Sequence, residues 1–488
     1  MSSDLVRVRT GVYHDSVSLM RVSQAITRLP GVEVAVVAMA TELNRDIAVE
    51  LGFDLPEAGP ADLLIALRSS GQDVLEGAAA ELDRLLTGLA SRTTGGVAAE
   101  HPPRTVRTAA RDAVHSGAAT LALVSVPGPH AFAEAMDAIE AGLSVMIFSD
   151  NVPIEQEVLL KRRAEERDVL VMGPDCGTAV IGGAGLGFAN VLRPGPVGVV
   201  AASGTGAQQV TCLLDLAGVG VSHVLGVGGR DLSEEVGGLS TLRALEALDA
   251  DPATELIVLI SKPPAPEVAR AVQEVVAKLA TPVVTALLGP GQDDLTAATE
   301  AALRALGVAV PAWRSWPAPL PERDRRDERD ERETAGAGEA SAPGGGPRAR
   351  RLRGIYSGGT LCVEARLIAG TGEFTDFGDD AYTRGRAHPM IDPALRLEAL
   401  AEVPPGDVAL LDVVLGHGAD PDPSVRLAPG VAAAVARGVP VVVALIGSEG
   451  DPQGLDAQAE ALRTAGAAVF TSNAQAARYA AGLLADAR

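Results

Sequence analysis

Short apolar runs alternate with amphipathic stretches in the first part of the chain. Two runs, "LVRVRT" and "VEVAVVAM", flank a segment with helical spacing of apolar residues from Ser16 to about Leu29. After a further helical segment, "ADLLIALRS" has the pattern of a third strand. We expect a small α/β or α+β domain over residues 1–95.

From residue 105 onward, apolar runs of strand length end in Gly, Ser, Pro or Asp and lead into helical patterns. Such runs, apolar on both faces and separated by helices, predict parallel sheets covered by helices on both sides. Before residue 316 they are "ATLALVSVP", "LSVMIFSD", "VLVMGPD", "VGVVAAS", "HVLGVGG", "ELIVLISKPP" and "PVVTALLGP". After a polar interruption the pattern resumes with "RGIYSGG", "DVALLDVVLGHG" and "VPVVVALIGSEG".

The interruption, residues 317–351, is a mixed-charge block followed by Gly, Ala, Ser and Pro. It has too little apolar surface to offset the entropy lost on ordering, so we predict a flexible linker. A weaker Gly- and Pro-rich break lies near residues 90–105. The pattern therefore predicts three α/β blocks, over residues 1–95, 105–315 and 352–488, with one linker.

Charge and cysteine content narrow the function classes. The chain has 41 Lys and Arg against 63 Asp and Glu, a net charge of −22, which would repel nucleic acid and anionic membranes. Its three cysteines include no CxxC pair, which is typical of a reducing compartment. No signal-peptide pattern, membrane-spanning apolar run or zinc-binding His spacing occurs. We expect a cytoplasmic protein without a metal, nucleic-acid or membrane partner.

A turn of hydroxyls and glycines follows the run "VGVVAA". Ser203, Gly204, Thr205 and Gly206 stand where a strand passes into a helix, and ligands of parallel sheets bind at this end of the strands. Glycines allow close approach of the backbone, and the free N–H groups of a helix start attract anions. A phosphate- or carboxylate-bearing small molecule is the expected ligand. The alternative is an ordinary Ser or Thr N-cap, which stabilises a helix by about 1 kcal/mol.

A polar turn before a later helix contains Arg384, Arg386, His388 and Asp392. Guanidinium groups bind phosphate or carboxylate bidentately, and histidine can donate or shuttle a proton. This turn is therefore a candidate substrate site. The alternative is an internal salt-bridge cluster with nearby carboxylates, namely Asp376, Asp379 and Asp380.

Two more strand ends carry polar residues. Gly416, His417 and Gly418 follow "DVALLDVVL", and Arg230 follows "HVLGVGG". Arg230 either binds substrate or ties its loop together. Cys176, in "GPDCGTAV", is interpreted as a packed small residue rather than a nucleophile, because the sequence shows no neighbouring base.

Long motifs resemble known enzymes. The segment from "ATLALVSVPGPHAF" to "VLVMGPDCGTAVI", followed by "VGVVAASGTGAQQV", resembles the α subunit of succinyl-CoA synthetase. The segment with "GIYSGGTLCVEARLI", "TDFGDDA" and "LDVVLGHGADPDP" is similar to the ligase domain of its β subunit. This fused arrangement, with "HPMIDP" and "VGGRDLSEEVGG", resembles the FdrA family of acyl-CoA-synthetase-like proteins.

The resemblance implies an α/β fold. It would comprise a Rossmann-like CoA-binding-type domain over 104–195, two flavodoxin-like succinyl-CoA ligase domains over 196–316 and 352–488, and the small domain in front. It also implies that two helix N-termini face one phosphate. The turn from Ser203 to Gly206 would supply one of them, and Gly416-His417-Gly418 the other.

The chain also departs from the synthetase. The segment "VTALLGPGQDDLTAATEAA" lacks the histidine that carries the phosphoryl group in that enzyme, and the ATP-grasp half of the β subunit is missing. No glycine turn that would hold CoA is recognisable before Arg104. No cofactor is therefore assigned with certainty, and CoA is the candidate.

The resemblance leaves three functions open. The first is a component of an oxamate carbamoyltransferase in purine and allantoin breakdown, acting on carbamoyl or acyl phosphate with partner subunits in an oligomer. In it His388, Arg386 and Asp392 would be catalytic, and Arg384 and Arg230 would bind substrate. The second is an acyl-CoA synthetase subunit that needs a partner, and the third is a non-catalytic assembly or regulatory scaffold.

Overall fold

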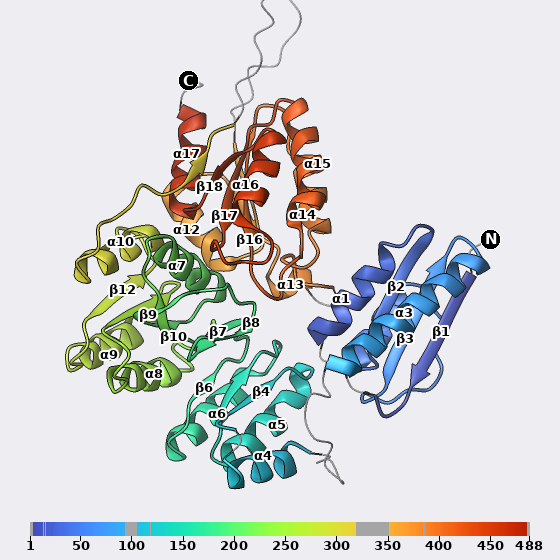
Figure 1. Ribbon diagram of the computed structural model, residues 1–488, viewed down its shortest axis with the longest axis horizontal. Helices are drawn as coiled ribbons and strands as arrows, with labels where there is room; N and C mark the ends of the chain where they lie inside the picture. The colour runs from blue at the N-terminus through green and yellow to red at the C-terminus, as the bar shows by residue number, and fades with distance from the viewer. Residues whose placement is uncertain are drawn as a thin grey trace, which may run out of the picture.

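The computed structural model describes residues 3–12, 14, 16–92, 105–117, 119–318, 351–383 and 386–485. They form four α/β units, each built on its own sheet (Figure 1). The predicted alternation of strands and helices is confirmed in all four. Most of the predicted linker, residues 319–350, lies outside the described residues. None of the described helices has the length and hydropathy needed to span a membrane.

The first unit is a three-stranded antiparallel sheet with β3 in the centre. Because β3 is apolar at nearly every position, it is buried on both faces: Leu63, Ile65 and Leu67 pack against α1 and α3, whereas Leu64 and Ala66 pack on the side of Phe53. Its elements are β1 (Ser3–Arg9), α1 (Ser16–Thr27), β2 (Val32–Met39), α2 (Glu42–Glu50), β3 (Leu63–Ser69) and α3 (Gln72–Arg92).

The second unit is a parallel three-stranded sheet in the order β4-β5-β6. Small side chains of α5, such as Ala131 and Ala135, pack closely on it, which is how a chain with few aromatic residues fills this core. Its elements are α4 (Val106–His115), β4 (Leu121–Val124), α5 (Gly128–Glu140), β5 (Ser144–Ile147), α6 (Ile154–Glu166) and β6 (Val171–Met172).

The third unit has the strand order β12-β11-β9-β10-β7-β8, with a parallel part from β12 to β10 and an antiparallel hairpin β7-β8. After β9 the chain forms β10 on one side of β9 and then β11 on the other side of β9. The strand order therefore reverses at β9. Its elements are β7 (Thr178–Ile181), β8 (Ala184–Gly187), β9 (Pro194–Ala201), α7 (Gly204–Leu216), β10 (Val221–Gly226), α8 (Leu239–Asp249), β11 (Leu256–Ser261), α9 (Pro266–Val276), β12 (Val283–Leu287) and α10 (Leu295–Ala305).

The fourth unit has the order β13-β18-β17-β16-β14-β15, and its strand order reverses at β14. Its edge strand β13 precedes residues 319–350, so the chain joins this sheet before the predicted linker. Its elements are β13 (Ser315–Trp316), β14 (Leu352–Tyr356), α12 (Gly359–Ala369), β15 (Glu373–Asp376), α13 (Asp380–Thr383), α14 (Ala394–Glu402), β16 (Val408–Val414), α15 (Pro423–Ala436), β17 (Val441–Ile446), α16 (Leu455–Thr464), β18 (Ala468–Phe470) and α17 (Asn473–Ala485).

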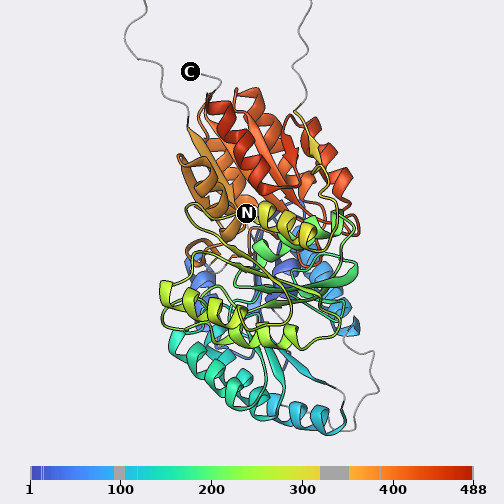
Figure 2. The same ribbon diagram turned by 90° about the vertical axis from the view of Figure 1, so that its left-hand side faces the viewer.

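The third and fourth units share one apolar core. A single cluster of buried side chains runs from Val197 on β9 to Ala480 on α17. Buried hydrogen bonds cross the same junction: Gln209 donates to the carbonyl of Thr471 at 3.0 Å and accepts the N–H of Asn473 at 2.8 Å. Figure 2 shows the second, third and fourth units stacked one above another.

Candidate anion-binding site

Helix α7 begins at the carboxyl end of β9 with the predicted turn. Ser203 is the N-cap residue, and its Oγ accepts the N–H of Gly206 at 2.9 Å, so the N-cap alternative holds for this hydroxyl. The cap does not use the N–H groups of Gly204 and Thr205, which lie in the first helical turn and have no intrahelical acceptor. These groups and the helix dipole remain available to an anion.

A second helix N-terminus, that of α12, lies directly against this turn. α12 follows Gly358, which makes no side-chain cap. A Cβ built on Gly358 would lie 2.6 Å from Thr205 Oγ1, so only glycine permits the approach. The starts of α7 and α12 therefore meet, each at the point where the strand order of its sheet reverses. Ligands of open α/β sheets bind at such points.

Asp412 on β16 holds the start of α12. Its buried carboxylate accepts the N–H of Ser357 at 2.7 Å, the Ser357 hydroxyl at 3.0 Å and the N–H of Gly358 at 2.8 Å. It also pairs with Arg396 at 3.2 Å. Burial raises the pKa of Asp412, and Arg396 and the hydrogen bonds oppose that shift. The free donors of this helix end are therefore those of Gly359 and the residues after it.

Lys262 brings a positive charge to the junction. It directly follows β11, is exposed, and has its Nζ 3.1 Å from the position of a Cβ on Gly359. Sequence reasoning missed it, although a signal was there: the chain has only three lysines, and Lys262 is the one that stands at the end of an apolar strand. Two helix N-termini with a lysine beside them suit a phosphate group.

Gly416, His417 and Gly418 do not form a helix start, because the helix that follows them, α15, begins at Pro423. They pack on the β7-β8 hairpin, where His417 bridges to Ala189. The N–H of Gly416 is donated to Gln453 at 3.0 Å, and the N–H of His417 to the carbonyl of Ala189 at 2.8 Å. Because these N–H groups are already used, this segment does not provide the second helix end. The helix end that meets α7 comes from "YSGG", which the sequence analysis did not single out as a site.

His388 lies beside the start of α12, against the third unit. Its ring centroid is 5.6 Å from that of Phe188, and its Nδ1 accepts the N–H of Met390 at 3.3 Å. Burial lowers the pKa of His388 to about 4, so the imidazole is neutral at physiological pH. With Nδ1 accepting, the proton of the neutral ring is assigned to Nε2, which makes His388 a hydrogen-bond donor.

Asp376, at the end of β15, faces both His388 and Lys262. Its Oδ1 accepts the N–H of Gly378 at 2.9 Å. A Cβ on Gly378 would lie 2.9 Å from His388 Nε2 and 3.1 Å from Asp376 Oδ1, and a Cβ on Gly359 would lie close to Asp376 Oδ2. Burial raises the pKa of Asp376, against the charge of Lys262.

The remaining predicted side chains are not gathered at this point. Asp392 pairs with Arg426, and Arg230 pairs with Glu157 at 2.9 Å and donates to the carbonyl of Val152 at 2.8 Å. Arg386 is exposed. The pair of Asp392 with Arg426 differs from the salt-bridge cluster with Asp376, Asp379 and Asp380 that the sequence left open. Arg384 lies outside the described residues.

Asp175 was not predicted and follows β6 in the turn that contains Cys176. Its surroundings raise its pKa to about 7, mainly by desolvation and then through Asp150 and Asp380, against Lys262 and Arg230. Its backbone has a positive φ of 57°, which is uncommon outside glycine. Cys176 is buried with its pKa raised to about 12, which supports the prediction that it is not a nucleophile.

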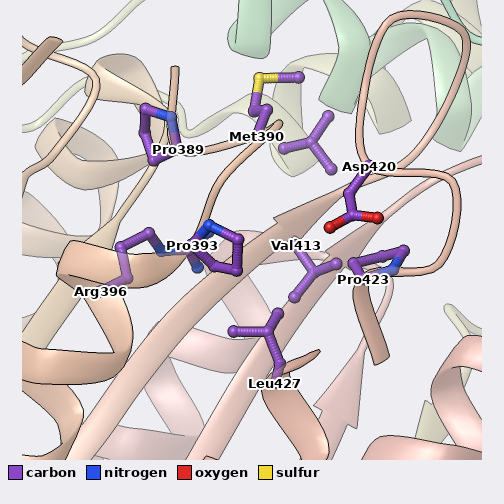
Figure 3. A pocket seen from close by; sticks show the side chains of 9 residues that line it. Pro389, Met390, Pro393, Arg396, Val413, Asp420, Pro423 and Leu427 are labelled. Carbon is purple, nitrogen blue, oxygen red and sulfur yellow. The ribbon is translucent and has the colours of Figure 1, made fainter. Parts of the chain in front are cut away.

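A small cavity lies behind the loop that carries His388. Pro389, Met390, Pro393, Arg396, Asp420 and Leu427 are among the residues that line it (Figure 3). Its volume is about 10 Å³, which accommodates roughly one water molecule. It is therefore too small for a substrate. On the outer side of the same loop, the first unit docks: Gln24 Nε2 donates to the carbonyl of Ile391 at 2.7 Å, and Arg28 lies 3.4 Å from Asp420.

Three protein families match this chain, and each match corresponds to one of the structural units. Residues 1–103 match a family described as AllF, heavy metal-associated domain; residues 193–287 match a CoA binding domain; and residues 355–483 match a CoA-ligase. The CoA-binding match covers part of the third unit, for which the resemblance implies a ligase-like domain. Helix α7 lies within this match.

Full-length and partial relatives agree with these matches. The protein YahF of Escherichia coli (strain K12) is 36% identical across 96% of both chains. A succinate–CoA ligase [ADP-forming] subunit alpha 2 of Archaeoglobus fulgidus is 30% identical over 31% of this chain, which spans about half (53%) of that relative. Among solved structures, an acetyl-coenzyme A synthetase of Ca. Korarchaeum cryptofilum aligns over 75% of this chain and 82% of its own, with 17% identity and a TM-score of 0.29.

The family matched by residues 1–103 is described as heavy metal-associated, but these residues offer few ligands for such a metal. Residues 1–103 contain no cysteine, and no group of three His, Cys, Asp or Glu side chains suited to a metal ion occurs among the residues that the structure describes. Soft heavy-metal ions favour thiolate and thioether ligands, and of these residues 1–103 hold only the thioethers of Met1, Met20 and Met39, without a thiolate. The donor set of this unit therefore does not fit such an ion, and no chemistry is assigned to one.

Proposed function

Because this chain belongs to the FdrA family of acyl-CoA-synthetase-like proteins, we propose that it binds carbamoyl phosphate and, with partner subunits, acts as an oxamate carbamoyltransferase in purine and allantoin breakdown. The observation that supports this proposal is the meeting of the starts of α7 and α12 beside Lys262. An already activated donor suits a phosphate site in a chain that lacks both the phosphoryl-carrying histidine and the ATP-grasp half.

In the proposed reaction the two helix ends and Lys262 hold the phosphate of the donor. Negative charge grows on this phosphate as its bond to the carbamoyl carbon breaks. Fixed N–H groups and an ammonium group aimed at that charge stabilise the transition state more than the ground state. His388 Nε2, a neutral donor, is suited to hydrogen-bond a carbonyl oxygen of either substrate. Arg384 or Arg386 is proposed to bind the oxamate carboxylate.

Replacing Lys262 with methionine tests the phosphate site. We expect Lys262→Met to weaken binding of inorganic phosphate and carbamoyl phosphate by about ten- to a hundredfold, since a charge-assisted hydrogen bond contributes about 1.5–3 kcal/mol. Isothermal titration calorimetry of the full chain measures this change. Lys278→Met removes an equally exposed lysine of the same unit and is the matched control. Equal phosphate affinity in the wild type and both variants would contradict the proposal.

Gly358 provides an independent test of the same site. In Gly358→Ala the added Cβ would lie 2.6–2.8 Å from three atoms of Thr205 and would push the two helix ends apart. We expect at least about a tenfold loss of phosphate affinity together with a stability loss of about 1–3 kcal/mol. Titration and thermal unfolding measure the two effects. Gly482→Ala, which adds a Cβ in open space, is the control.

An acyl-CoA ligase subunit is the second candidate, because α7 lies within the CoA-binding match and α12 within the CoA-ligase match. The α7 and α12 N–H groups would hold a phosphate of CoA as readily as that of carbamoyl phosphate. Heat from CoA, without heat from carbamoyl phosphate, would favour this candidate. No heat from CoA, phosphate or carbamoyl phosphate would favour the non-catalytic scaffold.

A further inference from the structure

The proton acceptor of the site is not His388. Its Nδ1 accepts the N–H of Met390, and burial keeps the ring neutral with its proton on Nε2. A transfer to a nitrogen nucleophile needs a base, because the attacking N–H must lose a proton for the product to be neutral at that nitrogen. Another group at the junction of α7 and α12 must therefore accept the proton that the attacking nitrogen loses.

Asp376 is the carboxylate that the fold places there. Its Oδ2 lies within contact distance of Gly359, the first residue of α12, on the same side as Lys262 Nζ. Its other oxygen, Oδ1, is occupied by the N–H of Gly378 at 2.9 Å. Oδ2 has no hydrogen-bond donor among the described residues, so it is the oxygen available to a ligand.

We propose that Asp376 is the general base of the transfer site and that the acceptor which it serves is a small molecule with an amide or amine N–H. The inference rests on the proposed function. The nitrogen of the acceptor attacks the carbonyl carbon of the donor and forms the new C–N bond. The C–O bond to phosphate breaks, and the phosphate oxygen keeps the electron pair. One N–H proton passes to Asp376 Oδ2 and from there to solvent.

The surroundings of Asp376 suit a general base. Burial raises its pKa, so its carboxylate is a stronger base than an exposed one, and Lys262 limits the shift. Rate should therefore rise with pH through the raised pKa. The titratable and charged groups that face Asp376 from the packed elements are Lys262, Cys362, Asp379, His388, Arg396 and Asp412.

Proton uptake on anion binding tests the position of Asp376 without requiring catalysis. An anion bound beside Asp376 raises the pKa of its carboxyl further, so the chain takes up a fraction of a proton. Sulfate is the probe, because it does not itself titrate in this range. Calorimetric titration of the full chain in buffers of different ionisation enthalpy, from about pH 4 to about pH 8, measures the uptake. We expect uptake in the wild type and in Asp379→Asn, and its loss in Asp376→Asn.

The outcomes separate the two proposals. Absence of anion binding in the wild type would overturn the proposed function and this inference with it. Anion binding with equal proton uptake in Asp376→Asn would overturn only the inference. In the complex with partner subunits, Asp376→Asn should lower kcat about 10²- to 10⁴-fold while the KM for carbamoyl phosphate stays within about threefold. Asp376→Glu should restore part of kcat, and Lys262→Met should move the acidic limb of the pH profile to higher pH.

Discussion

Replacement of Asp412 with alanine is expected to lower the free energy of unfolding by about 3–5 kcal/mol, because it removes one partner of a buried ion pair. The side chain of Arg396 would stay buried with its charge uncompensated, and the N–H groups of Ser357 and Gly358 would lose their acceptor. The start of α12 would loosen, so phosphate affinity should fall as well.

Urea unfolding followed by tryptophan fluorescence measures this effect, since both tryptophans of the chain, Trp313 and Trp316, lie near the junction of the third and fourth units. Asp392→Ala is the matched control. It removes a partly exposed carboxylate paired with Arg426, and such pairs contribute about 1 kcal/mol or less. A loss in Asp412→Ala no larger than that in Asp392→Ala would contradict the role given to Asp412.

Replacement of Lys161 with methionine should be of similar severity. Its ammonium group is buried between the second and third units, 2.8 Å from Glu157 and 2.6 Å from Asp231, and it donates to the carbonyl of Val227 at 3.0 Å. Methionine fills the space but leaves the buried carboxylate of Asp231 without its cation, whereas Glu157 keeps its contact with Arg230. We expect a loss of about 3–5 kcal/mol, with faster hydrogen exchange in α6 and in the loop before α8.

A double variant distinguishes charge imbalance from loss of packing. Lys161→Met combined with Glu157→Gln removes one of the two carboxylates that Lys161 contacts and so lowers the buried negative charge, which should make it more stable than Lys161→Met alone. Lys278→Met, an exposed lysine with no such partners, should leave unfolding and exchange unchanged. If the double variant were less stable than the single one, the Glu157–Lys161 contact would not be the source of the loss.

Much of the fold could be predicted because its signals are local. Strand β3 and the strands from β9 to β12 are almost wholly apolar, and the glycine and proline residues at their ends mark the turns. Strand β13 gave no such signal. It has two residues, and it is a strand only because Phe470 and Val469 lie opposite it. A pairing with a partner more than a hundred residues away leaves no local pattern.

The site was harder to predict than the fold. The turn at Ser203 was recognisable, because its residues are consecutive. The contact between Thr205 and Gly358, and the place of Lys262 beside Gly359, depend on how two sheets pack. The sequence could show that Gly416 and Gly418 are close to a strand end. It could not show that Gln453 and Ala189 use the N–H groups of Gly416 and His417.

The apolar cluster that runs through the third and fourth units keeps the starts of α7 and α12 together. If the third and fourth units lay on separate chains, the starts of α7 and α12 would meet only while the two chains stayed bound. Here β13 carries the chain into the fourth sheet, and Leu213 and Leu361 belong to the same buried cluster. The two helix starts are therefore brought together by the folding of a single chain, and dilution does not separate them.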